Sequence, residues 1–415
     1  MNQSNHTNLP NHSADNVPEL RFKIYDDVWQ LRKLKEMLVF KNGINAKKED
    51  YGRGYKFINV LDIIENDFIT YSKIKGSVNV TEEIFKKNQV EYGDILFQRS
   101  SETREEVGQA NVYLDKDHLV TFGGFVIRGK KIAPYNPFFF NSLLKTAQAR
   151  KEITSKSGGS TRFNVSQGIL SEVVLYFPSL PEQQKIANFL TTTDKKIQVL
   201  TRKVDLLKTY KKGVMQKIFK QEIRFRKEDG REFGDWQMVR ANQIFKSHSN
   251  KNHNGELPIL AVTQDEGVVR RDSIEKQIMS SEASVKSYKI IEKGDFVISL
   301  RSFQGGIEYS YIEGICSPAY TVLKSIIELN DVFYKYYMKK ESFISRLSAT
   351  VVGIRDGKQI SFSAFSGMKL IYPLQEEQTK IANFLTSIDK KIKATESQLA
   401  KMKSWKKSLL QQMFV

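Results

Sequence analysis

The sequence KIANFLTTTDKKI at residues 185–197 returns almost unchanged as KIANFLTSIDKKI at residues 380–392, an offset of 195 residues. The match extends without a gap over residues 178–219 and 373–414, with about 19 identities in 42 aligned positions. A repeat of this extent is typical of an internal duplication. The chain is therefore predicted to contain two related halves, each ending in one copy of this segment.

Apolar residues in both copies recur at alternating steps of four and three, which is the spacing of a coiled-coil seam. Each copy is predicted to form one long helix with a narrow apolar stripe that needs a partner helix. Acidic residues at its start and lysines at its end agree with the helix macrodipole. The predicted helix-pairing residues are Ile186, Phe189, Leu190, Ile197, Val204 and Leu207 in the first copy, and Ile381, Phe384, Leu385, Ile392, Leu399 and Met402 in the second.

The simplest partner for each stripe is the other stripe of the same chain, in an antiparallel pair. A coiled coil between two chains remains the alternative. A helix from Pro181 to Phe219 has a length of about 58 Å at 1.5 Å per residue. This is roughly one and two-thirds turns of B-DNA, at about 34 Å per turn, so the helices have the length of a spacer between two DNA contacts.

The composition indicates a globular protein with a polyanionic partner. Hydrophobic residues make up 40% of the 415 residues, enough for two or three cores. Lysine and arginine exceed aspartate and glutamate by 65 to 47, which gives a net charge of +18 and favours DNA, RNA or an anionic membrane as partner. The sequence contains no apolar stretch of eighteen residues and no signal peptide. We therefore expect no membrane span, and we expect a cytoplasmic location. The single cysteine, Cys316, excludes an intrachain disulfide, and with five histidines no zinc cluster is expected.

Five segments are expected along the chain. Residues 1–18 are a polar tail predicted to be disordered, and residues 178–220 and 373–415 are the two helical segments. Residues 19–177 and 221–372 are each long enough for one domain. These two segments open alike, with ELRF and EIRF, and mix strand patterns with helix patterns, such as helices predicted over residues 137–149 and 331–345. Each is therefore predicted to be a mixed α/β domain.

Two further motifs in each domain supply candidate nucleic-acid contacts. YGDILFQRS at residues 92–100 corresponds to KGDFVISLRS at 293–302, a turn and strand ending in Arg-Ser. SGGSTRFNVSQGIL at 157–170 corresponds to GIRDGKQISFSAF at 353–365, a polar glycine-containing loop whose donors suit phosphates and base edges. An ordinary solvated hairpin remains the alternative for this loop. The candidates are Arg99, Ser100, Arg104, Arg162 and Asn164 in the first domain, and Arg301, Ser302, Gln304, Arg355, Lys358 and Gln359 in the second.

Taken together, these motifs resemble the specificity subunit of type I restriction-modification enzymes over the whole chain. The resemblance is carried by LPEQQKIA at 180–187 and QEEQTKIA at 375–382, each before a heptad helix, with the ELRF opening and the GDIL-like strand in the preceding domain. The second copy lacks the proline. The resemblance implies two target recognition domains joined by two antiparallel helices in a pseudo-two-fold repeat. Each domain would read half of a bipartite DNA site, and the helices would set the gap.

The resemblance also implies the partners of the chain. Two methyltransferase (M) subunits would dock on the helices, and restriction/translocase (R) subunits would complete the complex. S-adenosylmethionine, ATP and magnesium are expected on those partners, with no cofactor or metal in this chain. The modification would be adenine N6 methylation by the M subunits.

The sequence itself lacks catalytic motifs. The string Asn136-Pro137-Phe138-Phe139 lacks the second proline of the adenine methyltransferase tetrad, and is read as a helix start. GIRDGKQ at 353–359 has the wrong spacing for a phosphate loop. The chain is therefore predicted to be a non-catalytic DNA-recognition subunit. The alternative is a non-catalytic adaptor that pairs through its helices, or a regulatory nucleic-acid-binding protein.

Overall fold

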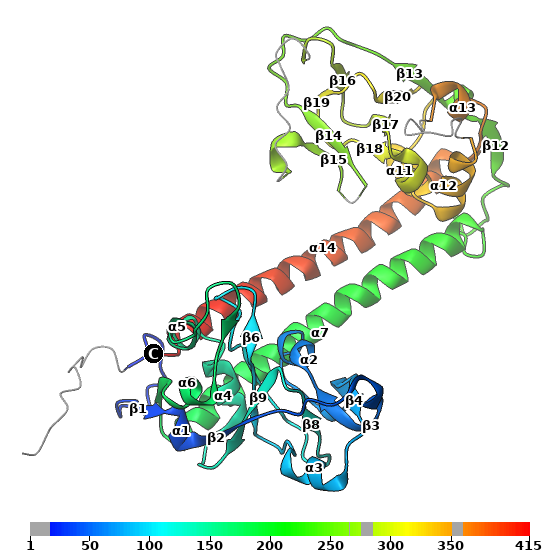
Figure 1. The fold of residues 1–415 in the computed structure, drawn as a ribbon. Coiled ribbons are helices and arrows are strands. Elements are labelled where there is room, and N and C mark those ends of the chain that lie inside the picture. The colour runs from blue at the N-terminus through cyan, green and yellow to red at the C-terminus, as the bar shows by residue number, and fades with distance from the viewer. Residues whose placement is uncertain (1–16, 265, 275–284, 351–359) are drawn as a thin grey trace, which may run out of the picture. The chain divides into compact units, whose positions relative to one another are not determined.

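A computed structural model describes residues 17–264, 266–274, 285–350 and 360–415. Contacts divide the chain into two compact units, each described here by itself: unit 1 comprises residues 1–201 and 397–415, and unit 2 comprises residues 202–396 (Figure 1). Unit 1 is therefore built from two separate segments of the chain.

Unit 1 is a mixed α/β unit around an antiparallel sheet of strand order β2-β9-β5-β7. Strand β1 pairs antiparallel with β11, β3 lies between β4 and β8, and the short strands β6 and β10 pair with each other. The strands are β1 Gln30–Lys33, β2 Leu38–Asn42, β3 Tyr51–Ile58, β4 Ser77–Val78, β5 Ile95–Gln98, β6 Ser100–Ser101, β7 Ala110–Val112, β8 Thr121–Phe122, β9 Val126–Lys131, β10 Phe163–Asn164 and β11 Val174–Phe177. The helices are α1 Leu34–Met37, α2 Val60–Ile64, α3 Glu82–Lys87, α4 Pro137–Leu143, α5 Ala147–Ser155 and α6 Gln167–Ser171, with 3-10 turns η1 Lys48–Asp50 and η2 Tyr71–Lys73.

Unit 2 repeats this plan around an antiparallel sheet of order β13-β20-β17-β18. Strand β12 pairs with β21 as β1 pairs with β11, and two further pairs are β14-β15 and β16-β19. The strands are β12 Gln237–Arg240, β13 Phe245–His248, β14 Leu260–Thr263, β15 Gly267–Arg270, β16 Lys289–Ile291, β17 Phe296–Ile298, β18 Glu308–Tyr309, β19 Gly314–Cys316, β20 Thr321–Ser325 and β21 Lys369–Tyr372. The helices are α8 Ala241–Ile244, α10 Ser302–Gly305, α11 Asp331–Tyr337, α12 Glu341–Ser348 and α13 Phe362–Ser366, with 3-10 turn η3 Arg271–Ser273. The predicted internal repeat and mixed α/β class are confirmed.

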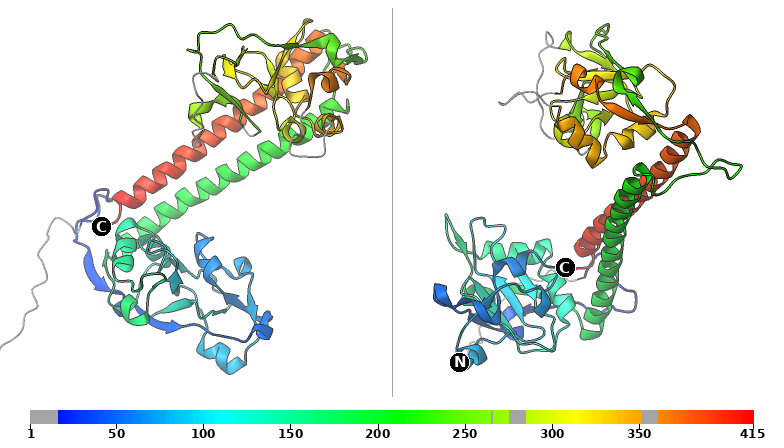
Figure 2. Two further views of the ribbon diagram at one scale, coloured as in Figure 1. Left: turned by 45° about the horizontal axis from the view of Figure 1, so that its top comes forward. Right: turned by 90° about the vertical axis from the view of Figure 1, so that its right-hand side faces the viewer.

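Two long helices, α7 Leu180–Phe219 and α14 Gln375–Gln412, run through the units as an antiparallel pair (Figure 2). In unit 1, Lys406 Nζ lies 2.5 Å from Asp194 Oδ1. In unit 2, the repeat-related residues Lys211 and Asp389 form the same pair at 2.6 Å. The prediction of an antiparallel pair within one chain is confirmed.

The predicted seam residues lie buried or half-buried along these helices. Ile186, Leu190, Val204, Ile381 and Leu385 are at most 6% exposed. The polar seam positions Thr193 and Thr395 are also buried, and each hydroxyl donates to a carbonyl oxygen of its own helix. The remaining predicted residues, Phe189, Ile197, Leu207, Phe384, Ile392, Leu399 and Met402, are buried or half-buried.

Each core includes the end of the long helix that belongs to the other half of the sequence. In unit 1, Phe414 stacks on Phe139, with ring centroids 5.3 Å apart, and its edge meets Trp29. In unit 2, Phe219 makes the related contact with Phe333, at 5.6 Å. Burying an aromatic side chain contributes about 2 to 3 kcal/mol to the free energy of folding. Each helix end therefore stabilises the domain formed by the other half of the sequence.

A buried carboxylate at the start of each long helix binds the opening segment of its domain. Glu182 is 1% exposed and accepts two hydrogen bonds of 2.7 Å from Arg21 of the ELRF segment. Glu377, also 1% exposed, accepts from Arg224 of the EIRF segment at 3.1 Å and from Trp236 Nε1 at 2.8 Å. The two motifs that are separated in the sequence are thus joined in space.

The glutamine that follows each buried glutamate makes further hydrogen bonds between the long helix and the domain. Gln183 donates to the Pro178 carbonyl at 3.0 Å and accepts the backbone N–H of Asn136 at 3.0 Å. Gln378 makes the related bonds to the Pro373 carbonyl and to the N–H of Asn330. The Glu-Gln pair therefore fixes each domain on its helix.

The short helices after the central sheet differ from the sequence prediction. One helix was expected over residues 137–149, and another over 331–345. The structure has two helices in each place, because Thr146 caps a new helix through the N–H of Ala149 and Lys340 begins another. Asn136 caps the first turn of α4, accepting from Phe138 and Phe139, so the predicted helix start is confirmed.

Candidate nucleic-acid interface

The GD motif of each domain forms a locked turn beneath the candidate site. Gly93 and Gly294 have φ of +95° and +100°, a region that favours glycine. Asp94 accepts the N–H of Glu91 at 3.1 Å, and Asp295 accepts that of Glu292 at 2.8 Å. Burial is the main cause that raises the pKa of both carboxyls, and their backbone hydrogen bonds oppose it. These aspartates hold the turn that starts the central strand.

In unit 1 the end of that strand meets the predicted glycine-containing loop. Strand β6 pairs with β10, which places Asn164 opposite Ser100 and Phe163 opposite Ser101. Val165 donates its N–H to the Arg99 carbonyl at 2.9 Å. Two motifs more than sixty residues apart in the sequence therefore form one surface.

Arg162 lies in a tight hairpin closed by Gly158 and Asn164, whose backbones exchange hydrogen bonds of 2.8 and 3.0 Å. Gly159 has φ of +113°, and a Cβ at this position would lie 2.1 Å from the Arg162 carbonyl oxygen. Asn164 Nδ2 also donates to that carbonyl at 3.0 Å. The loop thus has a defined conformation that needs glycine and leaves the Arg162 side chain exposed.

Three exposed arginines, Arg99, Arg104 and Arg162, lie near the paired strands β6 and β10. Each is next to an aromatic ring or a turn. Arg104 lies 5.3 Å from the centre of the Phe163 ring, and Arg162 lies 6.0 Å from that of Phe125. Arg99 Nη1 donates to the Gly124 carbonyl at 3.3 Å. Arg99 also borders an open hollow of about 460 Å³, which is lined by Asn42, Arg99, Gly158, Gly159, Asn164, Val165, Ser166, Gln167, Gly168 and Ile169.

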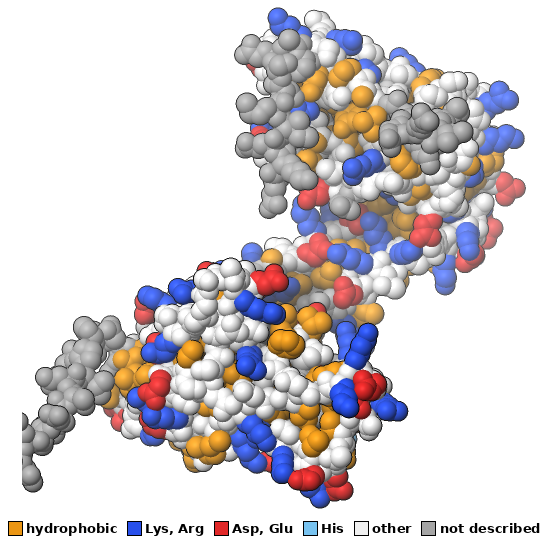
Figure 3. Space-filling view, viewed as in Figure 1, with side chains coloured by type: hydrophobic (Ala, Val, Ile, Leu, Met, Phe, Trp, Pro, Cys, Tyr) orange, Lys and Arg blue, Asp and Glu red, His pale blue; other side chains and the backbone are white. Residues whose placement is uncertain are grey.

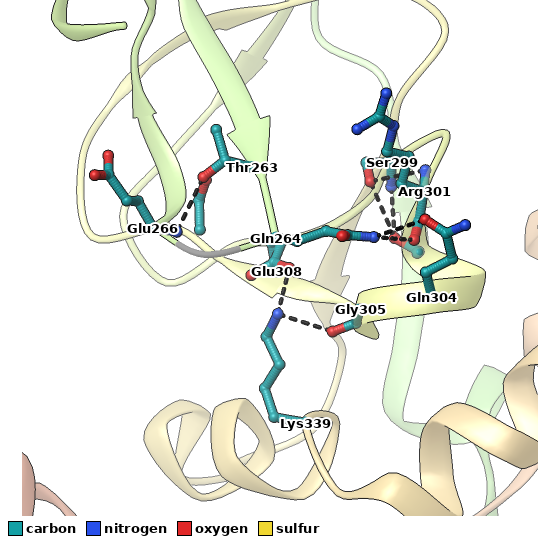
Figure 4. A network of polar contacts seen from close by, with 11 residues as sticks. Thr263, Gln264, Glu266, Ser299, Arg301, Gln304, Gly305, Glu308 and Lys339 are labelled. Atoms are coloured by element: carbon teal, nitrogen blue, oxygen red, sulfur yellow. Dashed lines mark hydrogen bonds and ion pairs between the residues drawn. The ribbon is translucent and has the colours of Figure 1, made fainter. Parts of the chain in front are cut away.

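In unit 2 the corresponding strand end carries a different set of polar groups (Figure 4). Gln264 Nε2 donates to Gln304 Oε1 at 3.1 Å and to the Arg301 carbonyl at 3.3 Å. Both glutamines and Arg301 are exposed. Among the described residues, no hydrogen bond or ion pair engages the Arg301 guanidinium, which in Figure 4 extends away from Lys339.

The same turn contains one predicted residue with an internal role. Ser302 is 1% exposed, and its hydroxyl accepts the N–H of Ser299 at 2.8 Å. Lys339 holds the turn from below, through Glu308 and through the Gly305 carbonyl at 2.9 Å. Ser302 therefore supports the turn from within the domain. Arg355, Lys358 and Gln359 lie outside the described residues.

Sequence reasoning did not identify Asn42, Phe125, Gln167 or Gln264 as neighbours of the candidates. Asn42 ends strand β2, and Gln264 follows β14, so only the strand pairing places them here. Phe125 is 63% exposed, a value that the sequence did not indicate.

The basic side chains of the molecule are widely distributed. Figure 3 shows lysine and arginine side chains spread over the visible face of both units, with acidic side chains between them. Within the described residues, no group of three or more histidine, cysteine, aspartate or glutamate side chains is arranged to hold a metal ion. Among the described helices, none is both long and apolar enough to span a bilayer.

A family model described as the type I restriction modification DNA specificity domain matches residues 26–209 and again residues 233–403. The chain belongs to this family. Each match covers one domain with most of the long helix that follows it. The resemblance noted in the sequence is thereby confirmed, as is the prediction that the chain is a non-catalytic specificity protein.

Several known proteins are similar over most of their length. The putative type I restriction enzyme MjaX specificity subunit of Methanocaldococcus jannaschii is 24% identical over 405 residues, which cover 92% of each chain. The MjaVIII specificity subunit of the same organism is 24% identical over 278 residues, covering 62% of this chain and 65% of that one. Both relatives are specificity subunits by name.

Solved structures share the fold at lower identity. The S subunit of a type I restriction-modification system from M. genitalium has a TM-score of 0.56 and 16% identity, covering 96% of this chain and 99% of its own. A chain from a structure concerned with complex assembly and conformational transition of the type I R-M system has a TM-score of 0.54 and 15% identity, covering 92% and 96%. These likenesses extend over both units and both helices.

Proposed function

We propose that this chain selects the DNA site of a type I restriction-modification complex, with each unit reading one half of a bipartite sequence. The observation that carries the proposal is a shared scaffold with different side chains at one place. Both units have the same central sheet order. At the strand end, unit 1 exposes Arg99, Arg162 and Asn164, whereas unit 2 exposes Arg301, Gln264 and Gln304. Two different half-sites are the expected consequence.

The chemistry of these groups fits the major groove. An arginine binds O6 and N7 of guanine with two hydrogen bonds, and asparagine or glutamine does the same with adenine. The Gln264–Gln304 pair orients both amides before DNA arrives, which lowers the entropy lost on binding. The surplus of lysine and arginine supplies affinity for phosphates that decreases as salt increases.

The two long helices are proposed to set the gap between half-sites and to bind two M subunits. Support comes from Tyr210 on α7 in unit 2, which is 53% exposed, and from Trp405 on α14 in unit 1, which is 45% exposed. These residues occupy equivalent positions of the repeat. Exposed aromatic residues are enriched at interfaces, and two equivalent ones suit two copies of one partner.

R subunits would join this assembly, and S-adenosylmethionine, ATP and magnesium would bind the partner subunits. The assembly would act in the cytoplasm, where chromosomal DNA is accessible to it. The chain itself would contribute DNA affinity, half-site choice and spacing.

The test is reconstitution of the full chain with its purified M subunits. Size-exclusion chromatography with light scattering should give one specificity chain and two M chains. Single-molecule sequencing of DNA methylated by this complex should give a split motif, and the chain alone should methylate nothing. A stable homodimer that ignores M subunits would support the helix-pairing adaptor instead and would refute the proposal.

A further inference from the structure

An exposed aromatic side chain, Phe125, lies on the arginine-rich surface of unit 1. Phe125 lies between β8 and β9 and is 63% exposed. A phenylalanine of this exposure contributes little to the core and leaves apolar surface in water. One exposed apolar residue is common on protein surfaces, so its surroundings decide whether it has a role.

The backbone around Phe125 is held rigidly. Its carbonyl accepts the N–H of Arg99 at 2.9 Å. The two preceding residues donate to the carbonyls of Ile58 and Ile44, at 3.0 and 2.9 Å. The side chain is therefore presented on an ordered turn, and little backbone entropy is lost when it binds.

The turn also depends on two glycines that pack closely against the domain. A Cβ on Gly123 would lie 2.7 Å from the Phe57 ring, and one on Gly124 would lie 1.7 Å from Asn45 Oδ1. Two consecutive close contacts fix the position from which Phe125 projects. The sequence thus has an exposed phenylalanine on a turn that tolerates little change beside it.

The charges around the ring favour a nucleic-acid partner over a protein. The Arg162 guanidinium lies 6.0 Å from the ring centre, and Arg99 binds the backbone of the same turn. Both are exposed, and Arg99 lines the hollow together with Asn42 and Asn164. An apolar ring beside cations and amides matches a DNA groove, which has phosphates along its rim and both polar groups and thymine methyl groups on its floor.

The related turn of unit 2 lacks such a ring. There the segment 317–320 precedes β20, as 123–125 precedes β9. Its exposed positions are Pro318 and Ala319, and Tyr320 is half-buried. At this turn, whose residues are all described, an exposed aromatic ring is present in unit 1 and absent in unit 2.

We infer that Phe125 contacts the apolar edge of a base, a thymine methyl group in the major groove, in the half-site read by unit 1. The inference rests on the proposed function, since it requires that unit 1 reads DNA. Its role is to discriminate between bases by shape, beside arginines that bind phosphates or guanine. Because phenylalanine carries no charge, its contribution should not depend on counterion release.

The experiment compares four variants of the full chain in the reconstituted M complex: Phe125→Ala, Phe125→Leu, Arg162→Ala and Ile132→Ala. Phe125→Ala removes the ring, and Arg162→Ala removes a neighbouring charge. Ile132→Ala is the matched control, because Ile132 is 54% exposed and follows the opposite end of the same strand β9. Affinity for the cognate duplex is measured over a salt series, and the methylated motif is sequenced.

Phe125→Ala is expected to weaken specific binding by about tenfold, to relax one or two positions of one half-site, and to leave the salt slope unchanged. Arg162→Ala should relax one position of the same half-site, as expected for an arginine that binds a guanine edge. Ile132→Ala should leave affinity and motif as in the parent chain. Phe125→Leu should recover part of the affinity, because it restores apolar contact.

Equal affinity and an identical motif for Phe125→Ala and the parent chain would overturn the inference. A relaxed position in the half-site read by unit 2 would also overturn it. If the parent complex binds no DNA, the proposed function fails, and this outcome is distinct from a Phe125 variant that matches a DNA-binding parent.

Discussion

Replacing Glu182 with glutamine should destabilise unit 1 by about 3 kcal/mol. Glu182 is 1% exposed, and its partner Arg21 is 10% exposed with two hydrogen bonds of 2.7 Å. Removing one charge from a buried ion pair costs about 3 to 5 kcal/mol, because the other charge stays buried without its partner. Glutamine keeps the volume and one acceptor, and Arg21 retains its bond to the Asp27 carbonyl. The expected loss of unfolding free energy therefore lies at the lower end of the range of about 3 to 5 kcal/mol.

The assay is urea unfolding of the full chain, with hydrogen exchange to locate the change. Amides of residues 19–33 should exchange faster in the variant, since Arg21 anchors this segment. Glu377→Gln is the matched control in unit 2, where Arg224 is 23% exposed and the hydrogen bonds from it are 3.1 Å or longer. Its loss should be smaller, about 2 kcal/mol, and confined to unit 2.

A change below about 1 kcal/mol for Glu182→Gln, or faster exchange spread equally over both units, would refute this reasoning. The first result would mean that the Arg21 guanidinium is hydrated in the variant with little loss of free energy, as in a solvent-exposed ion pair. The second would mean that the two units do not unfold separately.

Three further outcomes are expected. Arg301→Ala should relax one position of the half-site read by unit 2, whereas Arg162→Ala affects the half-site read by unit 1. The expected loss is about 1 to 3 kcal/mol of discrimination between bases. An unchanged motif in methylome sequencing would contradict this prediction. Deleting the heptad 196–202 of α7 should change the gap between half-sites or abolish assembly, and altered half-sites with the original gap would argue against a spacer. Cys316 is fully buried, and burial raises the pKa of its thiol to about 12; it should therefore resist a thiol reagent at pH 8 until unit 2 unfolds, and rapid labelling of the native chain would show that unit 2 opens locally.

The helices were predictable because their signal is local and periodic. The steps between Ile186, Leu190 and Ile197 depend only on helix geometry, and the repeat supplied the partner. The locked turn at Gly93 and Asp94 was similarly visible as a turn followed by a strand. For these features neighbouring residues determine the conformation, so one sequence suffices.

The candidate site was less predictable, because long-range pairing assembles it. Nothing near Arg99 in the sequence indicates that β6 will pair with β10 or that Gly124 will accept its hydrogen bond. Ser302 follows Arg301 as Ser100 follows Arg99, yet it is buried, because the turn in unit 2 folds back toward Ser299. The expected single helix over 137–149 divides because Thr146 caps a new one, a choice that depends on packing beyond periodicity.

The aromatic helix ends have a consequence for the order of folding during synthesis. Unit 2 is one continuous segment, residues 202–396, so it has all its parts before the final helical turns are made. Unit 1 needs residues 397–415, and its opening segment binds there directly, through the Leu20 N–H and the Gln412 carbonyl at 2.9 Å. The domain that is synthesised first is therefore the one that completes its fold last. The surface formed by Trp29 and Phe139 stays exposed to solvent until Phe414 packs against it. A chain that ends at residue 396 and has been released from the ribosome should therefore contain a folded unit 2 and an incomplete unit 1.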